Sequence, residues 1–322
     1  MLLGGGVIWV VDRANPAPHP PAVQAAEWRP KTIATDLPPG ELGQRIEYGY
    51  ALITRTAEQI GPLAPDSSRR YAGNYLTCGN CHLGGGTKIG SGSFVGVAKR
   101  FPQFRGRENK IGTLAERING CMERSMNGIA LPEESAEMEA MIAYMTWLSE
   151  GVPEGVEPVY RGYVRIEIPE AKADPAAGKA LYTQLCQACH QEGALGLKAP
   201  GEPFAGYIYP PLAGTDTYNN GAGMTRVLTA AEFIKGNMPL GATVDRPLLT
   251  DLQAYNIAAY INSLERPMKR NLEADFPDRK LKPVSTPYGP WADTFSVEQH
   301  TYGPFPPIIA YYKEAYGLEK AR

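Results

Sequence analysis

Two short motifs of identical spacing are the first indication of a chemical function in this sequence. Both read C-x-x-C-H, one ending at His82 and the other at His190. This spacing is typical of covalent haem c attachment, because two thiols about one helical turn apart can add to the haem vinyl groups while the next imidazole reaches the iron. A zinc site or a thioredoxin-like redox pair would leave the two histidines unexplained. The sequence therefore predicts two covalently bound haem c groups, attached through Cys78, Cys81, Cys186 and Cys189, with His82 and His190 as proximal iron ligands.

A methionine is the leading distal ligand of the second haem. Met238 lies in the run Gly-Asn-Met-Pro-Leu, where the following proline stiffens the loop. A thioether opposite a histidine raises the reduction potential of a haem. Met224, in a Gly-rich loop, and Met268, beyond the predicted closing helix, are the alternatives. The sequence favours Met238 as the axial ligand.

The fifth cysteine, Cys121, is left over once the two motifs are counted. An odd cysteine in an exported protein is an intermolecular bridge, a reactive thiol or a metal ligand, and the structural alternative is a small buried apolar side chain. Met238 precedes Tyr260 by 22 residues, whereas Cys121 and Met122 precede Tyr144 by 23 and 22. The internal repeat thus predicts a distal ligand of the first haem at this dipeptide, without separating its two members.

Basic residues surround this cysteine. Arg117, Cys121 and Ser125 are four residues apart, so they share one face if residues 113–127 are helical. Residues 99–124 hold seven basic and three acidic side chains, a local excess of +4. Guanidinium groups match oxyanions, so the segment predicts a small anionic substrate beside the first haem. The alternative is a solvated basic face or a docking patch for an acidic partner.

The whole chain carries no comparable charge. Its 322 residues include 32 basic and 34 acidic side chains, a formal charge of -2, and 43% are hydrophobic. This composition is that of a globular protein with room for two domains, and it argues against intrinsic disorder, a membrane-spanning protein and a nucleic-acid partner.

The segments that must position these residues occur twice. Four helices are predicted around the motifs: Leu42–Ile60, Glu133–Ser149, Pro175–Leu185 and Thr250–Leu264. Pro102 and Pro210 each follow their motif histidine by 20 residues, and a proline carbonyl in such a loop is expected to accept the proximal imidazole proton. The predicted fold class is therefore mainly α, with two tandem cytochrome c-type domains and an irregular C-terminal wrap.

Four regions follow from this plan. They are an N-terminal apolar run with a Pro-rich spacer (1–35), a first cytochrome c domain with the catalytic haem (36–155), a linker and second cytochrome c domain with the electron-transfer haem (156–268), and a C-terminal extension packed over both domains (269–322). The linker contains a strand-like run, Tyr163–Ile168, between Pro and Gly residues. His300, in the extension, is expected to have a packing role rather than to bind iron.

The N-terminal apolar run is relevant to the cellular location of the protein. Leu2–Val11 is apolar but shorter than the roughly 20 residues that span a bilayer, and it lacks the basic start of a signal peptide. It is interpreted as the end of a longer anchor or the remnant of an export signal. Bacterial c-type haems are attached outside the cytoplasmic membrane, so we expect a periplasmic or otherwise external protein, with membrane anchoring through the N-terminus left open.

Further runs add a specific resemblance. These are RINGCMERSMNG at 117–128, NMP at 237–239, PYGPWAD at 287–293 and HTYGPF at 300–305. Together with the two C-x-x-C-H motifs, over roughly residues 40 to 310, the chain resembles the dihaem thiosulfate dehydrogenases. The first domain is also similar to the sulfur-oxidation cytochromes with a cysteine-ligated haem.

The resemblance implies particular residues for each role. The family ligates its first haem by His and Cys, which implies His82 and Cys121, and its second by His and Met, which implies His190 and Met238. Its active-site arginines and serine correspond to Arg107, Arg117 and Ser125, so the catalytic set implied here is Cys121, Arg107, Arg117 and Ser125.

The implied reaction is oxidation of two thiosulfate anions to tetrathionate, with electrons passed to a soluble or membrane-bound cytochrome c; in principle the family also runs toward tetrathionate reduction. A thiolate ligand should lower the potential of the first haem and Met238 should hold the second higher, so electrons would leave through the second domain.

The alternative is a non-catalytic dihaem electron-transfer cytochrome c, for which Cys121 would have no role in turnover. A dihaem peroxidase needs a displaceable distal ligand and acid-base groups, for which the sequence offers no obvious match.

Overall fold

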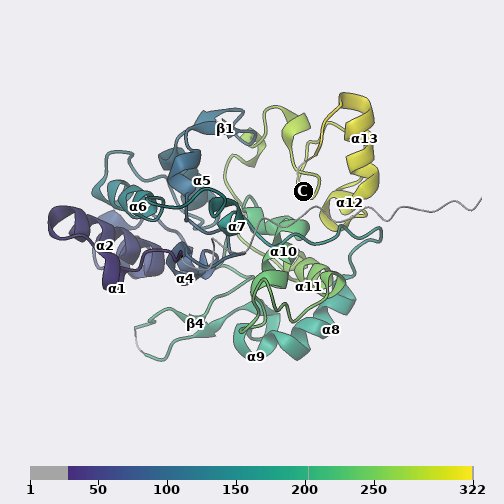
Figure 1. Ribbon diagram of the computed structural model, residues 1–322. Coiled ribbons are helices and arrows are strands. Elements are labelled where there is room, and N and C mark those ends of the chain that lie inside the picture. Colours follow the sequence, from purple (N-terminus) through teal and green to yellow (C-terminus); the bar gives the residue numbers. More distant parts are fainter. Residues whose placement is uncertain (1–27, 202, 321–322) are drawn as a thin grey trace, which may run out of the picture.

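The computed structural model describes residues 28–201 and 203–320, and this part of the chain contains thirteen α-helices, seven 3-10 helices and four short strands (Figure 1). The first half contains α1 (Ile33–Asp36), α2 (Gly40–Thr54), α3 (Thr56–Ile60), α4 (Leu83–Gly86), α5 (Leu114–Arg124) and α6 (Ala136–Trp147). The second half contains α7 (Glu157–Tyr160), α8 (Pro175–Leu185), α9 (Gln187–His190), α10 (Val227–Asn237) and α11 (Asp251–Ser263). The chain ends with α12 (Val297–Tyr302) and α13 (Pro306–Tyr316). The mainly helical prediction is confirmed.

The strands form two small antiparallel hairpins. They are β1 (Gln103–Arg105) with β2 (Lys110–Gly112), and β3 (Leu197–Lys198) with β4 (Tyr207–Tyr209). The predicted strand-like run Tyr163–Ile168 is wrong apart from its first residue, since the described structure pairs only Tyr163, in a single bridge to Ser91.

All four predicted helices are present, and one of them is divided. The predicted helix Leu42–Ile60 is interrupted at Arg55, whose φ of -132° and ψ of 40° are not helical, so α2 and α3 are separate. The helix at residues 175–185 begins with Pro175 and is capped by Asp174, whose side chain accepts hydrogen bonds from the backbone N–H groups of Ala176 and Ala177.

Each half contains a helix crossing of the same kind. α2 packs on α6 in the first half and α8 packs on α11 in the second. At each crossing a helical glycine faces a backbone carbonyl of the partner helix: a Cβ on Gly49 would lie 2.1 Å from the oxygen of Ala140, and one on Gly178 would lie 1.9 Å from that of Asn256. Ala140 and Asn256 occupy equivalent places in the repeat, four residues before Tyr144 and Tyr260.

We expect Gly178→Ala to lower the free energy of unfolding by about 2–3 kcal/mol, because the new methyl group must push α8 away from α11. The measurement is urea unfolding of the haem-loaded protein followed by circular dichroism. Lys179→Ala, at the exposed neighbouring position, should change the stability by less than about 0.5 kcal/mol. A Gly178→Ala protein as stable as the wild type would show that the crossing is looser than described.

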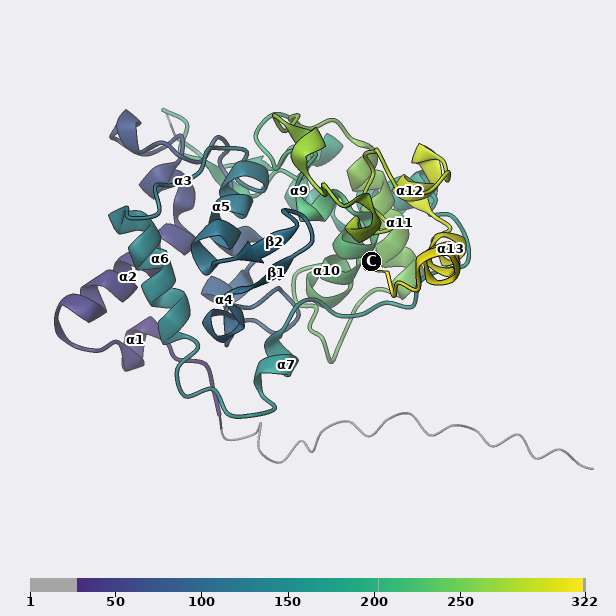
Figure 2. The ribbon, with the colours of Figure 1, turned by 90° about the horizontal axis from the view of Figure 1, so that it is seen from above.

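The C-terminal extension joins both halves. Phe276 donates its backbone N–H to the carbonyl of Arg107 in the first half (2.8 Å), and the carbonyl of Tyr302 accepts from the N–H of Ala173 in the second (2.8 Å). Phe305 and Tyr312 are buried in the same hydrophobic core as α11, and Figure 2 shows α12 and α13 beside that helix. The extension is therefore an ordered wrap with helices at its end.

His300 is part of this wrap. It is 1% exposed, its Nε2 lies 3.0 Å from the Asp293 carboxylate, and its ring stacks on Trp291. It has the packing role predicted for it.

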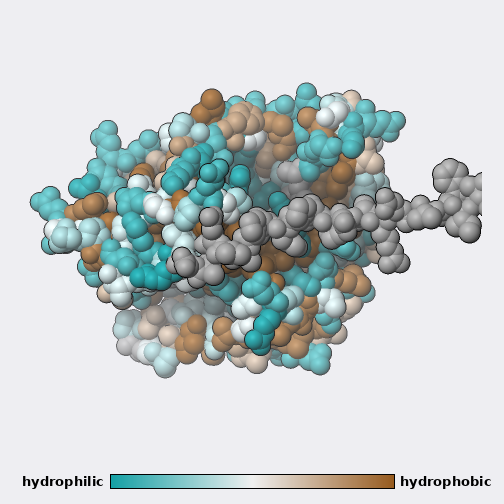
Figure 3. All heavy atoms as spheres, in the orientation of Figure 1, coloured by the Kyte–Doolittle hydropathy of each residue, from teal (hydrophilic) through white to brown (hydrophobic). Residues whose placement is uncertain are grey.

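The described residues contain no helix that is both long and apolar enough to cross a bilayer. The N-terminal run Leu2–Val11 lies outside the described residues. On the face shown in Figure 3, hydrophilic side chains are interspersed with smaller apolar groups.

Candidate active site

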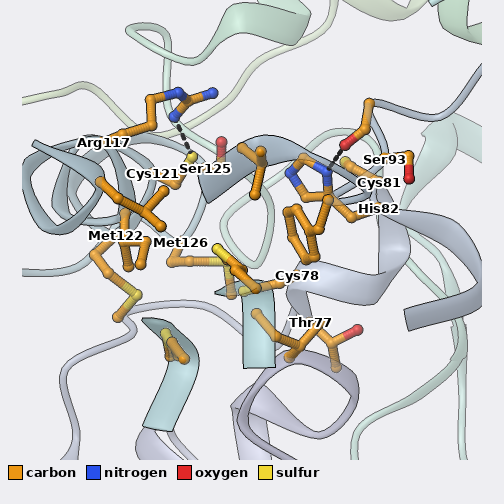
Figure 4. A pocket seen from close by; sticks show the side chains of 18 of the residues that line it. Thr77, Cys78, Cys81, His82, Ser93, Arg117, Cys121, Met122, Ser125 and Met126 are labelled. Atoms are coloured by element: carbon orange, nitrogen blue, oxygen red, sulfur yellow. Dashed lines mark hydrogen bonds between the residues drawn. The ribbon is translucent and has the colours of Figure 1, made fainter. Parts of the chain in front are cut away.

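The first C-x-x-C-H motif lines a cavity of about 270 Å³. Cys78 opens a 3-10 helix, Cys78–Asn80, whose start is capped by Thr77. Cys81 and His82 follow directly, and the side chains of Cys121 and Ser125 reach the same cavity from α5 (Figure 4). Most of the remaining lining is apolar: Ile53, Leu76, Phe94, Val97, Leu114, Ile118, Met122, Met141 and Met145. Two thiols, an imidazole and a third sulfur around an apolar cavity fit a haem c group.

The orientation of His82 is fixed by a carbonyl that the sequence did not indicate. Its Nδ1 lies 2.6 Å from the oxygen of Gly92, and since a carbonyl can only accept, Nδ1 donates and Nε2 is left to bind iron. The prediction that Pro102 would supply this carbonyl is wrong. The loop returns to the histidine after ten residues because Gly92, at a φ of 65°, brings the backbone against the ring, where a Cβ would lie 3.4 Å away.

The second motif lines its own cavity, of about 230 Å³, with Met238 on its wall. Here the carbonyl predicted to accept the proximal imidazole proton is present: the Nδ1 of His190 lies 2.9 Å from the oxygen of Pro210. Met238 directly follows the last residue of α10. Cys186, Cys189 and His190 complete a donor set that fits a haem c with His and Met as axial ligands.

Of the two alternative methionines, Met268 lies outside the second cavity and Met224 lies on a wall that this cavity shares with the first. Met268 is 73% exposed, and its sulfur lies 3.3 Å from the amide nitrogen of Asn220. Met224 lines both cavities, as do Leu76 and Tyr218, so these three side chains form part of the wall between them. This arrangement supports Met238 as the ligand.

Helix α5 brings the predicted chemical groups together. Its first turn is closed by a capping box between Thr113 and Glu116. One turn later, an Nη of Arg117 lies 2.6 Å from the sulfur of Cys121, and Ser125 caps the end of the helix at the same cavity (Figure 4). The guanidinium, sulfur and hydroxyl converge as their spacing predicted.

Cys121 has the character of a thiolate. Burial opposes its ionisation, but the charge of Arg117 and the contact with His82 outweigh burial and lower the pKa of Cys121 to about 6. Thiolates are the form of cysteine that binds metals and attacks sulfur. Met122, the other half of the dipeptide, is 1% exposed and belongs to the hydrophobic core. These environments favour Cys121 over Met122 as the distal ligand.

A second, polar cavity of about 290 Å³ adjoins the first and shares Cys121, Ser125 and His82 with it. We call it the oxyanion cavity. Its walls carry five arginines: Arg105, Arg107, Arg117, Arg124 and Arg226. This set is the structural basis for binding a small anion beside the sulfur of Cys121.

Arg107 is held by the C-terminal extension. Its Nη1 donates to the Asp275 carboxylate (2.6 Å), to the carbonyl of Gly221 (2.9 Å) and to the hydroxyl of Tyr288 (3.2 Å). The same guanidinium lies over the ring of Phe276, 4.9 Å from its centre. Asp275, which is 4% exposed, also accepts from Arg124 at 2.6 Å.

The sequence analysis missed part of this site. Asp275 and Arg226 are distant in sequence from the basic segment, and only the folded chain brings them to it. The segment itself is less positive in space than its +4 suggested, because the carboxylate of Asp275, which lies outside the segment, pairs with both Arg107 and Arg124 (2.6 Å each). Spacing identified the residues of one helix but not the partners that fold onto them.

Comparisons with known proteins agree with this architecture. Residues 69–153 match the family model for the SoxA/TsdA cytochrome c domain, and residues 173–261 match the one for cytochrome C oxidase, cbb3-type, subunit III. Two tandem cytochrome c domains, as predicted, are thereby confirmed.

Curated relatives extend the similarity over most of the chain. It is 38% identical over 248 residues to the thiosulfate dehydrogenase of Stutzerimonas stutzeri, covering 77% of this chain and 76% of the relative. It is 40% identical over 237 residues to that of Allochromatium vinosum, covering 72% and 82%. A solved structure, the thiosulfate dehydrogenase TsdBA of Marichromatium purpuratum, superposes with a TM-score of 0.68 at 35% identity over 78% of this chain. The match covers 52% of that longer chain.

Proposed function

Since this chain belongs to the thiosulfate dehydrogenase family, we propose that it is a dihaem cytochrome c that oxidises two thiosulfate anions to tetrathionate. The observation that carries the proposal is the contact between Arg117 and the sulfur of Cys121, at a place open to both the first cavity and the oxyanion cavity. A cysteine in this position, beside an anion-binding cavity, is not needed by a simple electron carrier.

The cofactors follow from the two cavities. One haem c would be held by Cys78 and Cys81, with His82 and Cys121 at the iron, and the other by Cys186 and Cys189, with His190 and Met238. When bound, each haem accepts one electron at a time, so a pair matches the two electrons released when two thiosulfates join through a new S–S bond. The balance is two S₂O₃²⁻ to one S₄O₆²⁻ and two electrons, with no proton taken up or lost.

The chain's own residues reduce the electrostatic repulsion between the two substrate anions. Two dianions repel each other, and they must approach until their terminal sulfurs are in contact. Arg107 and Arg117 supply fixed positive charge that offsets this repulsion, and the Ser125 hydroxyl is placed to donate to a sulfonate oxygen. Arg107 loses little freedom on binding because Asp275 already holds it.

Direction, acceptor and location are parts of the same proposal. Electrons leave through the second domain to an external cytochrome c, and the reaction is reversible toward tetrathionate reduction. A periplasmic or otherwise external location is supported by the two C-x-x-C-H motifs, because bacterial c-type haems are attached outside the cytoplasmic membrane.

Thiosulfate-dependent reduction of ferricyanide by the haem-loaded protein tests the function. The proposal predicts steady turnover with thiosulfate as the only electron donor. A dihaem electron-transfer cytochrome without catalytic activity is the alternative, and it predicts no thiosulfate-dependent reduction while reduced cytochrome c still exchanges electrons with the protein. That result would remove the enzyme assignment.

Met238→Ala should lower the reduction potential of the second haem by about 0.1 V or more, within the range of roughly 0.8 V that axial ligands cover. The measurement is a spectroscopic redox titration of the protein with both haems attached. Met268→Ala removes an exposed thioether and should leave both potentials unchanged. Unchanged potentials in Met238→Ala would exclude Met238 as an iron ligand.

A further inference from the structure

The five arginines of the oxyanion cavity differ in their partners. Arg105 pairs with Glu108, Arg107 and Arg124 pair with Asp275, and Arg117 contacts the sulfur of Cys121, all at 2.6–2.9 Å. Arg226 is the exception. Among the described residues no carboxylate lies within ion-pair distance of it, and its guanidinium makes one long hydrogen bond, from Nε to the carbonyl of Gly223 (3.4 Å).

Arg226 comes from a different part of the chain than the arginines of α5. It immediately precedes α10, whose other end leads into Met238. Its side chain reaches a cavity that is also lined by residues of the first half, by Gly223, Met224 and Thr229 of the second half, and by the extension. The oxyanion cavity is therefore built across both halves of the protein.

The environment of Arg226 is unfavourable without an anion. Burial, followed by the charge of Arg107, lowers the pKa of Arg226 to about 10. A half-buried guanidinium without a carboxylate partner is costly, and on the wall of a cavity it is available to bind an anion. The five guanidiniums outnumber the two carboxylates that pair with them, those of Asp275 and Glu108, so the cavity has an excess of positive charge that an anion such as thiosulfate would offset.

We propose that Arg226 is a substrate-binding residue, whose guanidinium binds the sulfonate oxygens of thiosulfate in the oxyanion cavity. The inference rests on the proposed function for the identity of the anion. It assigns to the second half of the chain a direct contact with the substrate, in addition to its predicted role in electron transfer.

The test is equilibrium binding of thiosulfate to haem-loaded protein whose two haems have both been reduced with titanium(III) citrate without oxygen, measured by isothermal titration calorimetry. Reduced haems accept no electrons, so thiosulfate stays intact. Arg226→Gln should weaken binding about 10- to 100-fold, the effect of losing a charge-assisted hydrogen bond, and Arg226→Lys should lie between. Arg246→Gln, at an exposed arginine of the same half, should bind as the wild type does.

Thermal unfolding without thiosulfate separates binding from a structural role. Because Arg226 lacks an anionic partner, Arg226→Gln should unfold at the same temperature as the wild type or higher. A lower unfolding temperature would indicate that Arg226 supports the fold and would contradict the proposal, as would unchanged thiosulfate affinity in Arg226→Gln.

The outcomes distinguish this inference from the proposed function. If the wild type binds thiosulfate through Arg226 and yet forms no tetrathionate with ferricyanide present, the enzymatic function fails and Arg226 remains an anion-binding residue. If the wild type turns over and Arg226→Gln retains its affinity and KM, the role of Arg226 fails alone.

Discussion

Cys121→Ala is expected to reduce the thiosulfate-dependent rate at least about 100-fold while both haems remain attached. The substitution removes the sulfur that lies 2.6 Å from Arg117 and faces both cavities, so the site loses a proposed iron ligand and a nucleophilic sulfur at once. The measurement is initial ferricyanide reduction at saturating thiosulfate, with haem content determined from the pyridine haemochrome spectrum.

Met122→Leu is the matched control for this prediction. Met122 is the neighbouring sulfur, it is 1% exposed in the core, and leucine conserves its volume. The Met122→Leu protein should keep most of the wild-type rate. If Met122→Leu lost the activity and Cys121→Ala kept it, the assignment of the dipeptide would be reversed.

Electron paramagnetic resonance of the oxidised protein adds a readout that does not depend on turnover. We expect the wild type to show one thiolate-ligated low-spin haem, and Cys121→Ala to lose that signal while the signal of the second haem stays. A wild-type spectrum without thiolate ligation would remove Cys121 from the iron.

Asp275→Asn should lower the free energy of unfolding by about 3–5 kcal/mol, because two guanidiniums would keep their charge after losing a buried counterion. Asp275 is 4% exposed and lies 2.6 Å from both Arg107 and Arg124. The effect is measured by urea unfolding of the haem-loaded protein. Glu139→Gln breaks the exposed ion pair with Arg45 and should cost less than about 1 kcal/mol. Equal effects of the two variants would contradict a structural role for Asp275.

The stability difference between the wild type and Asp275→Asn should depend on pH. Burial tends to raise the pKa of Asp275, but the hydrogen bond from Arg124 and the charge of Arg107 outweigh it and hold the pKa below its usual range. A carboxyl with a lowered pKa in the folded state stabilises the protein above its unfolded pKa, which is about 3.9, and loses that contribution as the pH falls. The stability difference between wild type and Asp275→Asn should thus be constant from pH 7 to 5 and shrink below about pH 4.

The sequence predicted those parts of the site in which the chemistry of the residues and their helical spacing indicate the same positions. The C-x-x-C-H motifs, the helices around them and the convergence of Arg117, Cys121 and Ser125 all depend on contacts within a few turns of chain. The repeat also located the helices that cross at Gly49 and Gly178, although the crossings themselves were not predicted.

Features set by tertiary packing could not be predicted in the same way. The acceptor for His82 is Gly92 rather than Pro102 because the first loop returns early. Arg226 reaches the oxyanion cavity, and Asp275 reaches the arginines on its wall, only after the second half and the extension fold against the first. Asp275 is more than 100 residues away from Arg107 and Arg124, beyond the range of any local pattern.

The stoichiometry of the catalysed reaction tests the central claim most directly. Haem-loaded wild-type protein is incubated with limiting thiosulfate and excess ferricyanide, and thiosulfate, tetrathionate and ferricyanide are quantified together. The account predicts one tetrathionate formed and two ferricyanides reduced for every two thiosulfates consumed. Thiosulfate consumed without tetrathionate, or more than one electron released per thiosulfate, would contradict it.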